Sequence, residues 1–302
     1  MSKPMIQLAR RAFLWIFCGA FFGVQALPTL AADTPAPVHG LWVWGTLTVI
    51  KGPRSAETLR DFCQSEGINE VYVSVSELKG GENQFAGLIA LLHQSKIQVE
   101  ALLGSKDADE PGPPREKLLD HLREIIQFNQ THPMDRFDGL HLDIEPQQRP
   151  ENYGPDNLRF LPRLIDAYRA ARQLAEPARM TVNADIPIKV LKGDLSQRRM
   201  LLSALPRLTL MLYQLSSPGD GESADKKAEK LRTVSARYLK IAYEGLDDPS
   251  LAKLSIGLRT PDYGDLLPRM FKTLDEAYGA NPHYLGWARH SYNDYVGQAA
   301  TP

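Results

Sequence analysis

Apolar and alternating segments short enough to be β-strands recur along the chain, and most are followed by a longer segment with helical periodicity. The pattern predicts eight strands, over His39–Thr46, Glu70–Ser76, Gln98–Leu103, Phe137–Glu145, Met180–Ile186, Leu208–Leu215, Leu254–Arg259 and Tyr284–Ala288. It predicts seven helices between them, over Ala56–Ser65, Phe85–Gln94, Pro114–Asn129, Leu158–Ala175, Leu195–Ala204, Ala224–Ala242 and Leu266–Tyr278. Such an alternation indicates parallel strands connected by crossover helices.

The number of these units selects among the parallel α/β folds. Eight strand–helix units in about 250 residues match a closed barrel, whereas an open doubly wound sheet usually has fewer strands. No glycine-rich dinucleotide or phosphate loop follows a predicted strand. Little chain remains after Ala288. We therefore expect one α/β domain over residues 33–302, a single (β/α)8 TIM barrel whose last helix is short or missing.

Two kinds of connection separate the predicted elements. Those from helix to strand are short, while several from strand to helix are long and polar, including Ser105–Pro113, Pro146–Asn157 and Ser216–Asp225. In TIM barrels the loops that follow the strands build the active-site face. We therefore expect the functional residues at the carboxyl ends of the strands.

The first residues have the parts of an export signal. Lys3, Arg10 and Arg11 precede an apolar run over residues 12–27, which is followed by small residues that suit signal cleavage. We predict a signal peptide over residues 1–32 and a mature protein that is periplasmic or secreted and not held in a membrane. The paired arginines also resemble the twin-arginine export signal, so two export routes stay open.

Composition narrows the kind of partner. The 302 residues carry a formal net charge of −1, and no basic stripe follows a predicted element. Nucleic acid is therefore not the expected partner. A carbohydrate or another uncharged polymer suits this chain better. We predict no cofactor, and the sequence does not indicate an oligomeric state.

The fourth predicted strand has an unusually polar face. In Phe137–Pro146, His141, Asp143 and Glu145 alternate with apolar residues, and side chains two positions apart share one face of a strand. Two carboxylates and an imidazole therefore point one way, while the apolar residues point towards packing. Pro146 cannot donate to a β-ladder, so the strand ends with Glu145 at its mouth.

The two carboxylates suit different roles. Their Cα atoms lie roughly 6.5 to 7 Å apart along one strand, whereas a retaining glycosidase needs its nucleophile across the sugar from its acid. The charge of Asp143 disfavours ionisation of Glu145, which keeps a proton available for a leaving group. We predict Glu145 as the proton donor and Asp143 as its helper.

The segment Asp138–Glu145 resembles the fourth-strand signature Asp-Gly-x-Asp-x-Asp-x-Glu of the family 18 glycoside hydrolases, the chitinase and endo-N-acetylglucosaminidase type. The resemblance implies that Glu145 is the general acid. It implies that Asp143 holds the acetamido group of the substrate while the carbonyl oxygen of that group attacks the anomeric carbon. The implied substrate is a polysaccharide that contains N-acetylated hexosamine. His141 stands where the family has an aspartate, and a histidine there can still hydrogen-bond Asp143.

Three further residues follow from weaker resemblances. Tyr213, in a Met-x-Tyr segment, takes the role of the tyrosine that steadies the acetamido group, and Gln214 replaces a common aspartate. Trp287 falls near the eighth-strand tryptophan that forms the floor of the sugar site. The third-strand Ser-x-Gly-Gly of the family is absent. The chain therefore reads as a divergent member of this group of barrels.

Other residues near strand ends complete the predicted substrate site. Asn183 and Asp185 alternate on one strand and share its inner face if the residues between them face the helices. Trp44 can stack on a sugar ring. Arg259 can equally bind substrate or pair with a carboxylate, and the pattern does not decide the face of Glu100. Together we predict substrate contacts from His141, Trp44, Asn183, Asp185, Gln214, Arg259 and Trp287.

The residues leave three other functions open. A retaining mechanism with a second carboxylate after strand seven is not among them, because Leu254–Thr260 contains no carboxylate. An inverting pair, Glu145 with Asp185 or Glu77, can act through water if their strands give the wider separation that this mechanism needs. The His-x-Asp-x-Glu face of strand four can instead hold the metal of a metal-dependent hydrolase. A barrel that binds polysaccharide without cleaving it is the third alternative.

Overall fold

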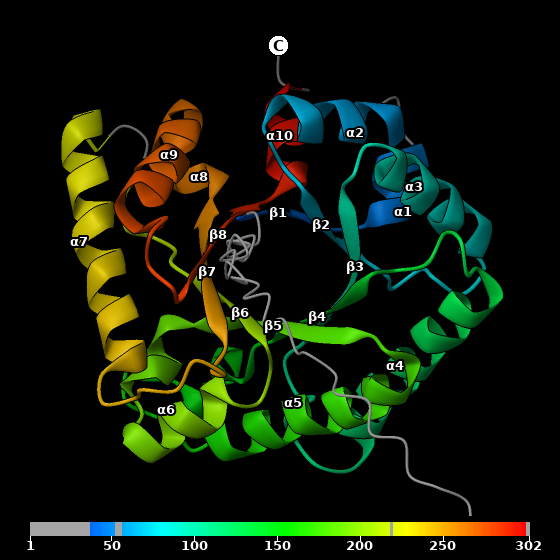
Figure 1. The fold of residues 1–302 in the computed structure, drawn as a ribbon, viewed down its shortest axis with the longest axis horizontal. Coiled ribbons are helices and arrows are strands. Elements are labelled where there is room, and N and C mark those ends of the chain that lie inside the picture. Colours follow the sequence, from blue (N-terminus) through cyan, green and yellow to red (C-terminus); the bar gives the residue numbers. More distant parts are fainter. Residues whose placement is uncertain (1–36, 52–55, 218–219, 300–302) are drawn as a thin grey trace, which may run out of the picture. The chain divides into compact units, whose positions relative to one another are not determined.

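Eight parallel strands, in chain order, close into one barrel in the computed structural model, with helices around it (Figure 1). The strands are β1 (Val38–Val43), β2 (Glu70–Ser74), β3 (Gln98–Ser105), β4 (Gly139–Ile144), β5 (Thr181–Pro187), β6 (Arg207–Met211), β7 (Lys253–Arg259) and β8 (Tyr284–His290). β8 pairs with β1, with Ala288 opposite Gly40, so the ring has no open edge. The predicted (β/α)8 TIM barrel is confirmed.

The structure describes residues 37–51, 56–217 and 220–299. The predicted signal peptide over residues 1–32 lies outside the described residues. The chain from Pro37 onward forms one compact unit. Within the described ranges, no helix is both long and apolar enough to cross a bilayer.

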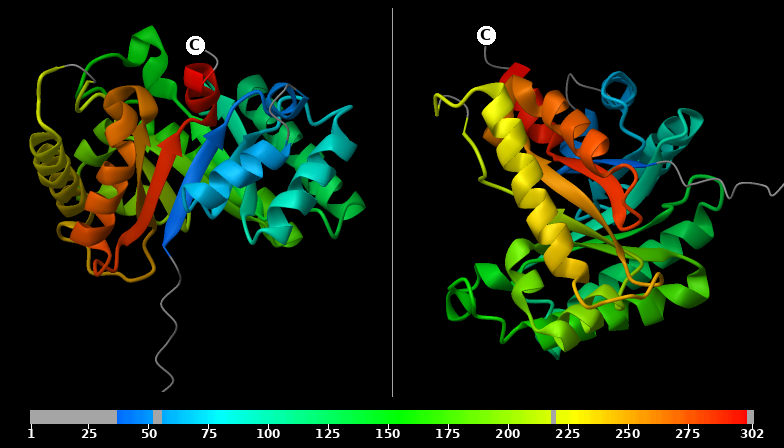
Figure 2. Two further views of the ribbon diagram at one scale, coloured as in Figure 1. Left: turned by 90° about the horizontal axis from the view of Figure 1, so that it is seen from above. Right: turned by 60° about the vertical axis from the view of Figure 1, so that its left-hand side comes forward.

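Helices that follow the strands cover the outside of the barrel, as Figure 1 shows. They are α2 (Ala56–Ser65), α3 (Glu82–Gln94), α4 (Pro113–Thr131), α5 (Leu161–Ala175), α6 (Leu195–Leu202), α7 (Ala224–Tyr243) and α9 (Leu267–Tyr278). They match the predicted helices to within three residues at each end. The short helix α10 (Tyr292–Ala299) follows β8 and lies beside its carboxyl end (Figure 2), so the expectation of a short last helix is confirmed.

Short helical turns in the loops were not predicted from the sequence. They are α1 (Thr46–Lys51), α8 (Thr260–Tyr263), η1 (Pro146–Gln148), η2 (Pro150–Asn152), η3 (Glu176–Ala178), η4 (Ile188–Lys192) and η5 (Gly264–Leu266). Most of them follow strands and therefore belong to the loops that surround the barrel mouth. Segments this short have little periodicity, so a pattern of apolar residues does not reveal them.

Several strand boundaries differ from the prediction by one to four residues, and two of these differences affect the site. β6 ends at Met211 because the chain turns after it, with Gln214 at a φ of 62° that a strand cannot hold. Tyr213 therefore lies on the loop after β6. β8 continues to His290, two residues beyond the prediction, which places His290 at the carboxyl end of this strand.

Inward-facing positions of the strands carry large rings beside glycines. A Cβ on Gly40 would overlap the hydroxyl of Tyr72, and one on Gly257 would lie 3.1 Å from the ring of Trp42. Both rings are at most 1% exposed. The glycines therefore make room for Trp42 and Tyr72 inside the barrel, next to the polar residues of β4.

Candidate active site

The polar face predicted for strand four lies inside the barrel. His141 and Asp143 lie on β4, and Glu145 follows at its carboxyl end. The apolar residues that alternate with them are fully buried in the layer between strands and helices. Pro146 begins the turn η1 directly after Glu145. The predicted alternation and the end of this strand are confirmed.

His141 lies between two buried carboxylates. Its Nδ1 is 2.9 Å from Oε2 of Glu100, its Nε2 is 2.9 Å from Oδ1 of Asp185, and these side chains are at most 2% exposed. The imidazole also stacks on Tyr72 with 3.8 Å between ring centroids. Both ring nitrogens are thus occupied, so the expected hydrogen bond from His141 to Asp143 is wrong. The ring is held instead by Glu100 and Asp185, which come from β3 and β5, the two strands that flank β4.

These contacts decide the charge of the imidazole. Burial disfavours the imidazolium, but the charges and hydrogen bonds of Asp185 and Glu100 outweigh burial and raise the pKa of His141 to about 10. The two neighbouring acids therefore favour the protonated form of the ring.

More charged groups lie towards the amino ends of the strands. Arg207 donates to Glu70 at 2.7 Å and also to Glu100, and Asn183 donates to Glu100 at 2.5 Å. Burial and then the charge of Glu100 raise the pKa of Glu70 to about 7, although Arg207 opposes this shift. Asn183 is 2% exposed and engaged with Glu100, so the prediction that Asn183 contacts substrate is wrong. The side chain of Asn183 points into the barrel as predicted, but it lies too far below the barrel mouth to reach a bound substrate.

Asp185 is the central acid of the barrel interior. Nε1 of Trp42 donates to Oδ2 of Asp185 at 2.9 Å, while Oδ1 pairs with the imidazole, and Asp185 is 1% exposed. Burial and, next, the charge of Asp185 raise the pKa values of Asp143, Glu145 and Tyr213. Asp185 therefore acts on all three predicted catalytic residues through its charge, while its own side chain is buried away from the barrel mouth.

Asp143 and Glu145 are both shifted towards their protonated forms. Oδ1 of Asp143 is buried and has no hydrogen-bond partner in the described protein. Glu145 is half-buried and accepts hydrogen bonds from Gln147, at 2.9 Å, and from Gln148. These bonds and the charge of Lys106 lower the pKa of Glu145 but do not outweigh burial and Asp185. These shifts favour the protonated form of Glu145, which is the form that a proton donor to a leaving group needs.

Tyr213 adds a second unpaired polar group. Its hydroxyl is buried and makes no hydrogen bond in the described structure. The guanidinium of Arg259 lies 5.6 Å from the centre of the tyrosine ring and donates to Asp262 at 2.9 Å. Asp262 also accepts from the backbone N–H of Gln214 at 2.6 Å. Of the two roles predicted for Arg259, the structure therefore shows the pairing with a carboxylate, which braces the turn that carries Tyr213. The side chain of Gln214 is exposed.

Trp44 lies at the mouth of the barrel as predicted. It is half-buried, and its Nε1 donates to Nε2 of His290 at 3.3 Å. The side chain of Asn293 makes two hydrogen bonds of 2.8 Å to the backbone of Trp44. The indole reaches to within 3.5 Å of the position that a Cβ on Gly104 would occupy, and Gly104 is the register partner of Asp143. Trp44 is therefore an aromatic surface next to the catalytic carboxyls.

Trp287 does not form the floor of the site. Its ring stacks on Phe271 of α9 at 3.9 Å and on His39 at 4.2 Å, and its Nε1 donates to Asp275 at 3.0 Å. Alternation along β8 turns Trp287 outwards, while His290 faces the mouth. The prediction that Trp287 contacts sugar is therefore wrong, and its weak sequence resemblance did not fix its face.

Several interior residues were not recognised from the sequence as part of the site. They are Trp42, Glu70, Tyr72 and Arg207, together with Glu100, whose face the pattern left undecided. Each polar member begins or interrupts an otherwise apolar strand. That signal marks a buried charge, but it does not say which strands across the barrel supply the partners.

The geometry also bears on the alternative functions. In the described ranges, no group of three His, Cys, Asp or Glu side chains is arranged to hold a metal ion. His141 directs its nitrogens at Glu100 and Asp185, so the three-ligand set expected on strand four is not assembled. Asp185 is 1% exposed and hydrogen-bonded through both oxygens, so it is poorly placed to activate the water of an inverting pair. Glu77, the other partner considered, is exposed.

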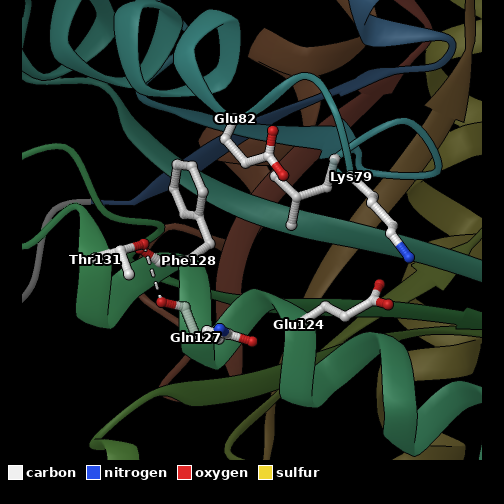
Figure 3. A pocket seen from close by; sticks show the side chains of 7 residues that line it. Lys79, Glu82, Glu124, Gln127, Phe128 and Thr131 are labelled. Atoms are coloured by element: carbon white, nitrogen blue, oxygen red, sulfur yellow. Dashed lines mark hydrogen bonds between the residues drawn. The ribbon is translucent and has the colours of Figure 1, made fainter.

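A cavity of about 320 Å³ lies away from this site, between the loop before α3 and the second half of α4 (Figure 3). Lys79 and Glu82 line one side, and Glu124, Gln127 and Thr131 line the other. The charged side chains are exposed. None of the predicted site residues borders this cavity, so it carries no part of the predicted chemistry.

Comparisons with known proteins identify the fold. No family model and no curated protein sequence matches the chain. Among solved structures, the PgaB (BpsB) glycoside hydrolase domain from Bordetella bronchiseptica has a TM-score of 0.52 at 14% identity, over 87% of this chain and 96% of that one. A β-1,3-glucanosyltransferase active-site mutant from Rhizomucor miehei, in complex with laminaritriose, has a TM-score of 0.50 at 13% identity, over 83% of this chain and 86% of that one.

A barrel of a different enzyme class is equally similar. D-psicose 3-epimerase from Clostridium cellulolyticum H10, solved with D-tagatose, has a TM-score of 0.51 at 11% identity, over 83% of each chain. At such identities the likeness shows the barrel fold. The resemblance predicted from strand four is thereby confirmed at the level of fold: this chain is a divergent TIM barrel whose structural neighbours include glycoside hydrolase domains.

Proposed function

We propose that this chain is an exported glycoside hydrolase that cleaves a polysaccharide containing N-acetylated hexosamine by a substrate-assisted acid mechanism. The general class is supported by the glycoside hydrolase neighbour from Bordetella. Because an epimerase is similar to the same degree, the fold alone does not carry the proposal. The residues of the site do.

The observation that carries the proposal is a pair of unpaired polar groups at the barrel end that also carries Glu145, an acid whose pKa is raised. Oδ1 of Asp143 and the hydroxyl of Tyr213 are buried without partners in the described residues. Asp143 and Glu145 lie at the carboxyl end of β4 and Tyr213 follows the carboxyl end of β6, so all three stand at the same end of the barrel. Leaving buried polar groups unpaired is costly, and a bound ligand would satisfy them. An acetamido group offers the N–H and the carbonyl that these two groups can bind.

The reaction then needs no nucleophile from the protein. The carbonyl oxygen of the acetamido group attacks the anomeric carbon while the glycosidic C–O bond breaks, and Glu145 gives its proton to the leaving oxygen. Asp143 holds the acetamido N–H, and Tyr213 donates to its oxygen. The Glu145 carboxylate then takes a proton from the water that opens the cyclic intermediate. This scheme explains why β7 supplies no second catalytic carboxylate.

Trp44 supplies the apolar surface that a sugar ring needs. Its half-buried indole lies beside the register partner of Asp143 and is fixed by His290 and Asn293. Aromatic rings stack on the C–H faces of sugars. We assign Trp44 to the sugar that carries the acetamido group.

Export completes the proposal. The predicted signal peptide over residues 1–32 would place the mature protein in the periplasm or outside the cell, where it would meet a carbohydrate polymer. The N-terminal sequence of protein recovered from the native host tests this part. An intact start at Met1 would contradict it.

The catalytic assignment is tested with purified wild type, Glu145→Gln and Asp143→Asn on chitin-type, peptidoglycan and biofilm glycans, with new reducing ends as the readout. Both variants should lose at least about a hundredfold in rate, because each loses a group that acts on the reacting atoms. Glu124→Gln is the matched control, since Glu124 is an exposed carboxylate on α4. The assignment fails if no glycan is cleaved or if Glu145→Gln cleaves as fast as wild type.

A thiazoline that mimics the cyclised intermediate separates the two carboxylate mechanisms. It should inhibit the wild type and bind more weakly to Tyr213→Phe and Asp143→Asn. Hydrolysis that the thiazoline does not inhibit would favour an inverting pair. Binding of glycan without cleavage would favour the non-catalytic alternative.

A further inference from the structure

The buried charges inside the barrel form one continuous hydrogen-bonded chain that the proposed reaction does not use. It runs, in order, through Glu70, Arg207, Glu100, His141, Asp185 and Trp42. These residues come from β2, β6, β3, β4, β5 and β1. The interiors of TIM barrels are usually filled by branched apolar side chains, and buried charges cost free energy unless they are well paired. Such a chain therefore calls for a role.

We propose that His141 is a permanently protonated positioning residue, which as an imidazolium between Glu100 and Asp185 anchors the Asp185 carboxylate on the strand beside Asp143. The protonation state stands on the geometry of the buried chain alone. The role in catalysis rests on the proposed function.

The hydrogen bonds require two donors from the ring. Both nitrogens of His141 lie 2.9 Å from a carboxylate oxygen, and an ionised carboxylate only accepts. Glu100 also accepts from Arg207 and Asn183, and Asp185 accepts from an indole N–H. Every other partner of these two acids is thus a donor, which favours their ionised forms. An imidazole that meets two carboxylates in this way carries protons on both nitrogens.

Most of the ionisable groups around His141 are acids. The titratable or charged groups around this site come from most of the strands. They are Glu70 and Tyr72 from β2, Glu100 from β3, Asp143 and Glu145 at the end of β4, Asp185 from β5, Tyr168 from α5, Arg207 from β6, Tyr213 after β6, and His290 from β8. The nearest group from β1 is the neutral ring of Trp42, 6.2 Å from the imidazole between centroids. The two carboxylates that contact the imidazole, Glu100 and Asp185, thus have the guanidinium of Arg207 on Glu100 alone. The imidazolium supplies the second positive charge that they need.

This balance explains the departure from the sequence signature. An aspartate at position 141 would add a carboxylate between Glu100 and Asp185 without any compensating cation. With two acids already level with this position, a histidine is the residue that satisfies both. The change at position 141 is therefore coupled to the acids on β3 and β5.

The anchored acid affects the proposed reaction through its charge. His141 and Trp42 hold one oxygen of Asp185 each, so the carboxylate cannot turn away. Its negative charge opposes ionisation of Glu145 and Asp143. Asp185 therefore keeps the proton on Glu145 without touching the substrate, and His141 keeps Asp185 in place.

The protonation state is tested by nuclear magnetic resonance of the full chain labelled with ¹⁵N-histidine, with His141→Gln used to assign the ring signals. We expect both ring nitrogens of His141 to stay protonated between about pH 5 and 8, the range in which histidine ordinarily changes charge. His283, whose pKa burial lowers, should deprotonate within or below this range and serves as the internal control. An unprotonated ring nitrogen on His141 at neutral pH would overturn the proposal. If His141→Gln does not fold, Glu100→Gln assigns the same signals by shifting them.

The positioning role is tested by the pH profile of kcat/KM for Asp185→Asn. Without the charge of Asp185 the pKa of Glu145 should fall, so the alkaline limb should move to lower pH by about one pH unit. Asp275→Asn, at a carboxylate outside the barrel wall, is the control and should leave the limb in place. An unmoved limb in Asp185→Asn would overturn the positioning role. If no glycan is cleaved, the proposed function fails and takes the positioning role with it, while the resonance experiment still decides the charge of His141.

Discussion

Trp42 and Asp185 lie on opposite strands of the ring, β1 and β5, and meet inside the barrel in a hydrogen bond of 2.9 Å. The second oxygen of Asp185 pairs with His141. A carboxylate whose two oxygens are both held has a fixed position. The negative charge that Asp185 brings beside Asp143 is therefore positioned by packed strands and not by a loop.

The indole N–H of Trp42 should accordingly contribute to stability. Trp42→Phe leaves one oxygen of the buried Asp185 without its donor, which should cost about 1 to 3 kcal/mol of unfolding free energy in urea denaturation. Trp287→Phe is the matched control, because its indole donates to Asp275, a carboxylate that is 35% exposed and that water can reach. The control should lose less. Equal losses in both variants would show that ring packing alone is measured.

The sequence predicts the barrel because its signals are periodic. Alternation of apolar and polar residues gave all eight strands, and the seven long helices followed from helical spacing. The same alternation placed Asp143 and Glu145 on the inner face of β4, since a period of two fixes the face once the apolar side is known.

The errors concern contacts between strands. His141 and Asn183 both point inwards as predicted, but their partner Glu100 lies on β3, about forty residues or more away in the chain. Register between strands decides such pairs, and no local pattern encodes it. The prediction for Trp287 was wrong for a different reason. On a strand that is buried on both faces, the sequence does not show whether a single aromatic side chain points into the barrel or towards the helices.

Stability should fall as the pH rises above the ordinary pKa of histidine. The pKa of His141 is about 10 in the folded protein against 6.5 ordinarily, so the folded state binds this proton more tightly than the unfolded state. The contribution is complete below pH 6.5 and is lost as the pH rises towards 10. Urea unfolding across this interval should show a falling free energy in wild type and a flatter dependence in His141→Gln. Parallel curves for the two proteins would contradict the assigned cation.

Trp44 and Trp287 were both predicted from the sequence to contact sugar, and their substitutions should now have different effects. Trp44→Ala removes the aromatic surface at the barrel mouth, so KM should rise about tenfold or more on a cleaved glycan, while the half-buried position limits the loss of stability. Trp287→Ala removes a ring packed against Phe271, so unfolding free energy should fall by about 3 to 5 kcal/mol. KM of the folded fraction should stay unchanged. Assays at saturating and limiting glycan, together with urea unfolding, distinguish the two patterns, and a raised KM in Trp287→Ala would restore the original prediction for that residue.

Tyr213→Phe removes one oxygen atom, and this change should lower the rate without lowering the stability of the protein. The hydroxyl is buried and has no partner in the described residues, so its removal relieves an unsatisfied group and the unfolding free energy should stay equal or rise by up to about 1 kcal/mol. In the proposed reaction the same hydroxyl donates to the acetamido oxygen, so kcat should fall by about 10² to 10³. Tyr243→Phe is the control, because its hydroxyl donates to the backbone carbonyl of Ala252. That variant should lose stability and keep its rate. A Tyr213→Phe protein that is less stable but equally active would place Tyr213 among the packing residues.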